Sequence, residues 1–292
     1  MSSIDVLIDI KNQLGEGPLW DVEEQRLYWV DGFGMLVFRA TADGREVRAW
    51  EVPQPVGCLA LRKSGGAVLA LQNGFHFLDF TTGEVTSIGD PEADRPDNRF
   101  NDGKVDRRGR FVAGSLNMKR DGKFAALYRL DPDLTIHRLQ EGIACTNGPC
   151  WSPDGCAFYF SDSGSGEIWA YDYDIESGRI ANRRRFAQAS TPDGGIPDGS
   201  TVDEEGFLWS AQIFGGRLIR YAPDGSIDRV VEMPVKNVTS VMFGGPDLDI
   251  LYVTSMARRH AHHLPADTVH RGSVFTVRGL GVRGLPETRF AG

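Results

Sequence analysis

Short apolar runs bounded by turns, rather than helical stripes, organise this chain. Six such runs cover residues 27–31, 68–72, 111–115, 158–162, 208–212 and 251–255. Apolar segments of this length between Asp-Gly, Gly-Gly and Pro-Asp turns are typical of β-strands. The runs begin 41, 43, 47, 50 and 43 residues apart, and a period of about 40–50 residues is typical of a propeller with four strands per blade.

The turns between the runs support the same architecture. Each run follows one turn and precedes a second pair of strand-like segments with its own turn, which predicts six blades. We expect the strand-like segment 5–9 to pair with the last blade and close the ring, because an open ring would leave an unpaired sheet edge. No linker or charge run interrupts the chain. The sequence therefore predicts an all-β, six-bladed propeller in a single domain over 1–292.

The repeat also predicts which side chains face the centre of the ring. In a propeller the innermost strand opens each blade, so its start should lie about ten residues before the apolar run. Stepping back ten or eleven residues from the six runs reaches Glu16, Cys58, Asn101, Asn147, Asp198 and Ser240. Four of these side chains carry amide or carboxylate oxygens, the donors that hard divalent cations prefer. The glycines beside them allow a close approach to a shared centre.

Two alternatives compete with a metal site at these positions. Asn-Gly and Pro-Asp-Gly are common turn formers, so each taken alone is more simply structural. Oxygen-bearing side chains, however, recur at the same position of the repeat in four blades, and this recurrence favours the metal site. Cys58 is the other candidate, as a nucleophile, but its apolar neighbours disfavour a thiolate. A zinc site of the sulfur and imidazole kind is not indicated, because cysteine occurs only once and histidine never at these six positions.

Composition narrows the function classes. The chain has 292 residues, 41% hydrophobic and 25% charged, with a net charge of −8. An acidic balance argues against broad binding to nucleic acid or to an anionic membrane, and no apolar stretch is long enough to span a bilayer. Four cysteines and the absence of a signal-like N-terminus favour a reduced, cytoplasmic setting. The 35 glycines fit a chain of many short strands and tight turns.

Five motifs identify a family resemblance. LGEGPLW (14–20), RFNDGKVD (99–106), TNGPCWSPDG (146–155), IPDGSTVDEEGFLW (196–209) and MFGGPDLDILYVTS (242–255) resemble the regucalcin/gluconolactonase family. The resemblance implies a six-bladed propeller that hydrolyses sugar lactones with one divalent metal at the channel mouth: calcium, zinc, manganese, magnesium or iron(II). It implies that Glu16, Asn147 and Asp198 bind the metal, that Asp198 is also the acid/base residue, and that Arg99 and Asn101 hold the substrate.

The chemistry expected of such a site is consistent with these residues. A divalent cation can polarise the ring carbonyl and activate a water, while Asp198 can take a proton from the water and return it to the leaving oxygen. Two other readings stay open: a calcium-binding propeller without catalysis, and a lactonase acting on an anionic sugar lactone. An arginine at the mouth, Arg99, favours catalysis, because a calcium buffer has no use for it.

Two basic segments depart from the family pattern. The stretch GSLNMKRDGKFAALY (114–128) is basic where many relatives carry an acidic residue near Lys119, and 255–273 is rich in arginine and histidine. We therefore expect Lys119 and 258–260 to contribute positive charge near the mouth and to favour an anionic substituent on the lactone. The alternative is that these side chains pair with surface carboxylates at Asp94, Asp97 or Asp121, where they would contribute little.

Several other residues have simpler readings. His260, His262 and His263 resemble a metal cluster but are more typical of a solvated loop. Cys145 and Cys150 flank Asn147 and are expected to be reduced core residues. Trp20, Trp151 and Trp209 recur at blade starts and are expected in the core. Asp102 is expected to orient either Arg99 or a loop backbone. Lactone chain length and oligomeric state are left open by the sequence.

Overall fold

The computed structural model describes residues 2–189, 194–258 and 268–292. All of its regular structure is β, in six four-stranded antiparallel sheets. The first three sheets are formed by β2 (Gly15–Asp21), β3 (Arg26–Asp31), β4 (Leu36–Thr41) and β5 (Arg48–Glu51); by β6 (Val56–Leu61), β7 (Ala67–Leu71), β8 (Gly74–Leu78) and β9 (Val85–Gly89); and by β10 (Asn98–Val105), β11 (Phe111–Asn117), β12 (Ala125–Leu130) and β13 (Ile136–Ile143).

The other three sheets follow the same order along the chain. They are formed by β14 (Thr146–Trp151), β15 (Ala157–Asp162), β16 (Glu167–Asp174) and β17 (Arg179–Gln188); by β18 (Ile196–Val202), β19 (Leu208–Ile213), β20 (Arg217–Tyr221) and β21 (Ile227–Glu232); and by β22 (Val238–Gly244), β23 (Ile250–Ser255), β24 (Val274–Arg278) and β1 (Ser3–Ile8). No helix long and apolar enough to cross a membrane occurs among the residues that the model describes.

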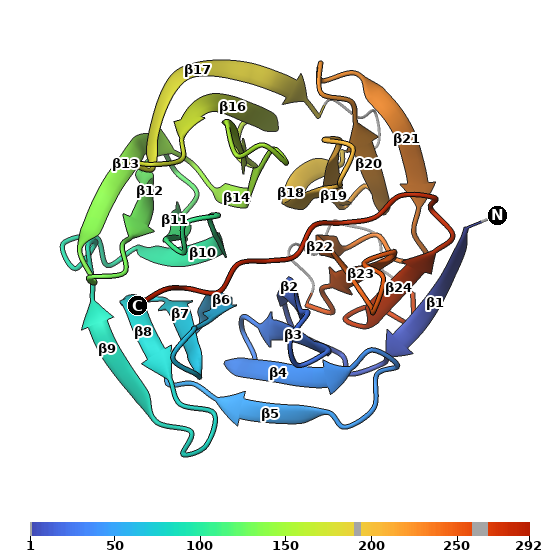
Figure 1. Cartoon of the computed structure of the whole chain (residues 1–292), viewed down its shortest axis with the longest axis horizontal. Coiled ribbons are helices and arrows are strands. Elements are labelled where there is room, and N and C mark those ends of the chain that lie inside the picture. Colours follow the sequence, from blue (N-terminus) through green and yellow to red (C-terminus); the bar gives the residue numbers. More distant parts are fainter. Residues whose placement is uncertain (1, 190–193, 259–267) are drawn as a thin grey trace.

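The six sheets are the blades of a propeller, arranged in a ring with β2, β6, β10, β14, β18 and β22 innermost (Figure 1). The six predicted apolar runs coincide with the second strands, β3, β7, β11, β15, β19 and β23. The N-terminal strand β1 pairs antiparallel with β24, with Ser3 opposite Arg278. The predicted fold and the predicted ring closure are both confirmed.

Apolar side chains between adjacent blades form the core. Six clusters of buried residues each join two neighbouring blades, as alternation along the strands requires. Trp20, Trp151 and Trp209 are 1%, 6% and 0% exposed and belong to three of these clusters. The prediction that the three tryptophans are core aromatics is confirmed.

The innermost strands approach one another closely because glycine occupies the contact positions. A Cβ at Gly57 on β6 would lie 2.0 Å from the backbone oxygen of Asn101 on β10. The pairing of each innermost strand with its neighbour also shifts register near the predicted central residues, for example between Phe100 and Gly103 and between Pro197 and Ser200. Such shifts change the direction in which local side chains point. They occur in all six blades at the same end of the ring.

The C-terminal segment 279–292 crosses the middle of the ring (Figure 1). It contacts the far ends of the innermost strands and the loops that follow, and Phe290 is fully buried. Backbone hydrogen bonds connect it to four blades. The amides of Phe290, Ala291 and Gly284 donate to the carbonyl oxygens of Leu61 (2.8 Å), Gly109 (3.0 Å) and Leu248 (2.8 Å). Its Arg283 carbonyl accepts from the Glu204 amide at 2.9 Å. The predicted central residues lie near the starts of the same strands, so this segment covers the opposite end of the channel.

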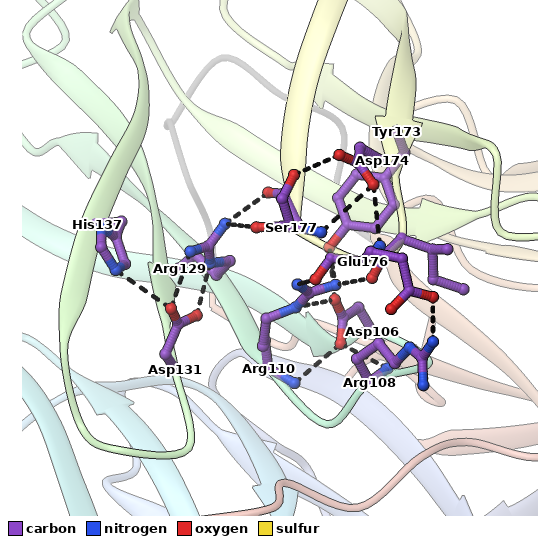
Figure 2. A network of polar contacts seen from close by, with 12 residues as sticks. Asp106, Arg108, Arg110, Arg129, Asp131, His137, Tyr173, Asp174, Glu176 and Ser177 are labelled. Carbon is purple, nitrogen blue, oxygen red and sulfur yellow. Dashed lines mark hydrogen bonds and ion pairs between the residues drawn. The ribbon is translucent and has the colours of Figure 1, made fainter.

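A buried polar network joins the third and fourth blades away from the centre (Figure 2). Arg110 Nε donates to Asp106 Oδ2 at 2.6 Å, and the hydroxyl of Tyr173 donates to the same oxygen at 2.5 Å. Arg129 Nη1 donates across the blades to the carbonyl oxygens of Ser177 and Gly178. Asp106 and Arg110 are 1% and 6% exposed. Each buried charge in this pair therefore depends on the other for compensation.

Candidate functional site

The innermost strands carry all six residues that the repeat predicted at the centre. They are Glu16 on β2, Cys58 on β6, Asn101 on β10, Asn147 on β14, Asp198 on β18 and Ser240 on β22. Four of them, Glu16, Asn101, Asn147 and Asp198, line one cavity of about 470 Å³, together with Arg99. The fold thus brings together both predicted carboxylates, both predicted amides and the arginine.

Cys58 and Ser240 do not line this cavity. Cys58 is fully buried in the apolar cluster between the second and third blades. Burial raises the pKa of its thiol well above the ordinary value, and the carboxylates of Asp102 and Glu16 raise it further. The thiol is therefore held protonated and unreactive, which removes the nucleophilic alternative.

A chain of hydrogen bonds fixes the two amides. Asn101 Nδ2 donates to Asn147 Oδ1 at 2.7 Å and to Thr146 O at 2.8 Å. Asn147 Nδ2 donates to Ser163 Oγ at 2.8 Å, and that hydroxyl donates to Pro197 O at 2.6 Å. The nitrogen of Asn147 is thus committed to Ser163, and its oxygen keeps a second lone pair for a ligand.

The two carboxyl groups are buried beside each other. Glu16 and Asp198 are 6% and 5% exposed. Burial raises the pKa of Glu16 well above its usual range, and the charges of Asp198 and Asp102 add to the effect. Burial likewise raises the pKa of Asp198, again with a contribution from Asp102, while Arg120 and Arg99 oppose it. Like charges held out of water are costly, and a divalent cation between them would relieve this cost.

The donor set fits a hard divalent cation. Glu16, Asp198 and the oxygen of Asn147 supply carboxylate and amide oxygens from three blades that line one cavity. Among the residues described, no group of three or more His, Cys, Asp or Glu side chains is placed to hold a metal. The described residues therefore hold no metal site made of these side chains alone. A cation bound by Glu16 and Asp198 would need the amide oxygen of Asn147 as its third protein ligand.

Asp102 serves the backbone rather than Arg99. Its Oδ1 accepts from the Gly103 amide and its Oδ2 from the Gly148 amide, both at 2.8 Å. The second bond joins β10 to β14, the two strands that carry Asn101 and Asn147. Of the two roles predicted for Asp102, the backbone role is the one observed.

Arg99 lies in the wall of the cavity. It is 6% exposed, and its Nη1 donates to the carbonyl oxygen of Phe100 at 2.8 Å. Burial lowers the pKa of its guanidinium from the ordinary value. The guanidinium lies 5.4 Å from the ring centre of Phe33, and that of Arg258 lies 4.3 Å from the same ring. Phe33 also lines the cavity, so two arginines flank one aromatic side chain at its edge.

Lys119 is not brought to the cavity. Its ammonium pairs with Asp97 Oδ2 at 2.6 Å, and its side chain is 61% exposed. This is the surface pairing that the sequence analysis held as the alternative. Arg120 and Lys123 of the same basic stretch line the cavity instead. The sequence correctly indicated a basic segment near the cavity. It could not predict which of its side chains point into the cavity, because that depends on the conformation of the turn between the two strands.

Two cysteine predictions have different outcomes. Cys150 is 2% exposed in the core between the fourth and fifth blades, as predicted. Cys145 lines the cavity and is only partly buried, so the core prediction is wrong for it. The reason is that it precedes β14 and lies at the rim rather than inside the sheet. Both are free thiols. His260, His262 and His263 lie outside the described residues.

Comparisons with known proteins place the chain in a family. The model of the SMP-30/gluconolactonase/LRE-like region matches residues 14–257. The chain belongs to this family. Regucalcin from Danio rerio is 39% identical over 297 residues, covering all of both chains. L-arabinolactonase from Azospirillum brasilense is 38% identical over 294 residues, covering 98% of this chain and 95% of its own. The predicted family resemblance is confirmed.

Further relatives agree in sequence and in fold. A 6-deoxy-6-sulfogluconolactonase from Pseudomonas putida is 36% identical over 283 residues, covering 96% of this chain and 95% of its own. Among solved structures, a luciferin-regenerating enzyme matches over all of both chains with a TM-score of 0.94 and 30% identity. The calcium-binding protein regucalcin from Agrobacterium tumefaciens matches over 98% of this chain and 96% of its own, with a TM-score of 0.89 and 28% identity.

Proposed function

We propose that this protein hydrolyses the ester bond of a sugar lactone to give the sugar acid, with one divalent cation held by Glu16, Asn147 and Asp198. The observation that carries the proposal is the convergence of two buried carboxylates and a fixed amide oxygen in one cavity. Relatives over nearly the full chain are named as lactonases, which supports the same reaction class. The cavity, at about 470 Å³, has room for a small sugar.

A divalent cation, when bound, supplies polarisation of the ester carbonyl and a more acidic water. Asp198 is the acid/base residue in this proposal. Its carboxyl is buried, and burial raises its pKa above the ordinary aspartate value, as is common for groups that exchange protons in active sites. It accepts a proton from the attacking water and returns one to the leaving ring oxygen.

Arg99 and Asn101 orient the substrate. Arg99 is anchored by its bond to the Phe100 carbonyl and by its position near Phe33, so it presents a fixed cation to the carbonyl or hydroxyl oxygens of a sugar. The side-chain nitrogen of Asn101 donates to Asn147 and Thr146. Its amide oxygen can therefore accept a hydrogen bond from a sugar hydroxyl. Glu16 acts as a ligand only.

A calcium-binding propeller without catalysis is the second candidate function. One structural relative is named as a calcium-binding protein. The roomy cavity and the buried Arg99 in its wall favour catalysis, because a buffer needs carboxylates but no cation facing its ligand.

The test is a panel of aldonolactones assayed with purified protein that has been stripped of metal and reloaded with calcium, zinc, manganese, magnesium or iron(II). We expect acid release that requires metal and saturates with lactone. Specific metal binding without hydrolysis of any lactone in the panel would favour the second candidate. Hydrolysis that is unchanged after stripping would contradict the proposed role of the cation.

A further inference from the structure

Basic side chains gather on one side of the cavity. The turn between β11 and β12, residues 118–124, contributes Arg120 and Lys123 to its lining, and Arg99 comes from the adjacent strand β10. Of the lining residues within 2–189, 194–258 and 268–292, two are carboxylates, Glu16 and Asp198. With these two engaged by a divalent cation, the charge left facing a substrate is that of the three basic groups.

No carboxylate pairs with Arg120 in the part of the chain that the structure describes. Among the described residues, its guanidinium has no hydrogen bond or ion pair, whereas the neighbouring Lys119 is paired with Asp97 at 2.6 Å. The backbone of Arg120 is held by a hydrogen bond from its amide to Asn117 O at 3.1 Å and has a φ of +54°. This left-handed conformation is uncommon for a residue with a side chain and belongs to a tight turn.

Lys123 is only weakly neutralised. Its ammonium lies 3.8 Å from Asp162 Oδ2, and its side chain is 56% exposed. The other oxygen of Asp162, Oδ1, already accepts from the amides of Ala144 and Cys145 at 3.2 and 3.1 Å. Asp162 is buried, but the ammonium of Lys123 is half-exposed and lies beyond hydrogen-bond distance of the carboxylate. Lys123 can therefore approach an anion in the cavity as well.

Arg99, Arg120 and Lys123 line the same cavity. A negatively charged group bound in this cavity can therefore accept hydrogen bonds from more than one basic side chain.

We infer that Arg120 and Lys123 form an anion subsite at the rim of the cavity, which binds a negatively charged substituent on the lactone remote from its ester. The inference rests on the proposed lactonase function and specifies its substrate class: aldonolactones with a terminal sulfonate, phosphate or carboxylate. The new carboxylate of the product forms at the other end, next to Glu16 and Asp198, so the rim cations are not needed for it.

The test compares kcat/KM for a neutral aldonolactone and for the same lactone carrying a terminal sulfonate, phosphate or carboxylate. The variants are Arg120→Gln and Lys123→Gln, with Lys119→Gln as the matched control from the same turn. Charge-assisted hydrogen bonds have typical strengths that correspond to about 10-fold to 100-fold in binding. We expect losses of this size for the anionic lactone in the first two variants, a change under about 3-fold for the neutral lactone, and none in the control.

Salt and a binding assay separate the possible outcomes. The preference for the anionic lactone should shrink between low and high ionic strength, because both side chains are partly exposed to solvent. Calorimetry with the open-chain sugar acid, with and without the terminal anion, measures the subsite independently of turnover. Equal kcat/KM for neutral and anionic lactones, or equal losses in Lys119→Gln, would overturn the subsite while leaving the lactonase intact. No hydrolysis of any lactone would refute the lactonase proposal itself, and the calorimetry would then decide the subsite alone.

Discussion

Replacing Glu16 with glutamine tests the electrostatic account of the metal site. The change keeps the shape and one amide oxygen but removes one of the two buried negative charges. In the metal-free protein, Glu16→Gln removes a buried carboxyl group whose pKa is raised by burial and by the charge of Asp198. We therefore expect the metal-free variant to be at least as stable as the parent near neutral pH.

The stabilisation by bound metal, in contrast, should be smaller in Glu16→Gln than in the parent. A cation that binds only the folded state stabilises the parent by about 2.7 kcal/mol when its free concentration is 100 times its Kd. Losing one charged ligand weakens binding by about 10-fold to 100-fold. At the same cation concentration the variant would gain only about 0.4–1.4 kcal/mol. For chains of this size class, 1 kcal/mol corresponds to about 2–4 °C in Tm.

Thermal unfolding with and without cation measures the difference. We expect a rise of about 5–10 °C in the parent and a clearly smaller rise in the variant. The pH dependence has a definite sign: a carboxyl whose pKa is raised by folding makes the metal-free protein less stable as pH rises above the ordinary carboxyl range. The stabilisation by cation should therefore grow with pH over the same interval. Equal Tm shifts in both proteins would refute the reasoning.

Three further predictions concern the scaffold. Arg110→Ala should lower the free energy of unfolding by about 3–5 kcal/mol, because it leaves Asp106 buried and uncompensated; a denaturant titration measures it, and a loss under 1 kcal/mol would contradict it. Phe290→Ala should cost about 3–5 kcal/mol, because the fully buried ring anchors the C-terminal segment; unchanged stability would show that the segment is not anchored there. Gly57→Ala should cost about 1–3 kcal/mol by forcing β6 away from Asn101, with a measurable loss of lactone turnover; wild-type stability and turnover would refute the close approach.

The sequence predicted the fold and the central residues because both depend on periodicity. Six apolar runs at a regular spacing predict six blades, and the same spacing places Glu16, Asn147 and Asp198 at the starts of the innermost strands. What periodicity cannot supply is side-chain direction where the pairing is irregular. Each innermost strand shifts register near its central residue, as between Asn147 and Cys150, and this local change decides which side chains reach the cavity.

Turns and the chain end were harder to predict for related reasons. The sequence singled out Lys119, but the turn conformation of Arg120 at positive φ and the pairing of Lys119 with Asp97 reverse the assignment. Cys145 was expected in the core, yet it lies just outside β14 and faces the cavity. Segment 279–292 has few regular contacts of its own, so only tertiary packing reveals that Phe290 crosses to the second and third blades.

Hydrolysis by Asp198→Asn tests the central claim most directly. The substitution keeps an oxygen ligand for the cation but removes the group that accepts and returns the proton. The cation is supplied in an excess that saturates the variant despite its weaker binding, and metal loading is measured in parallel. Under these conditions we predict a folded, metal-loaded variant whose kcat for aldonolactones falls by about 100-fold to 10,000-fold. A variant that binds metal and hydrolyses lactones at a rate close to that of the parent would contradict the account and leave Asp198 as a structural ligand only.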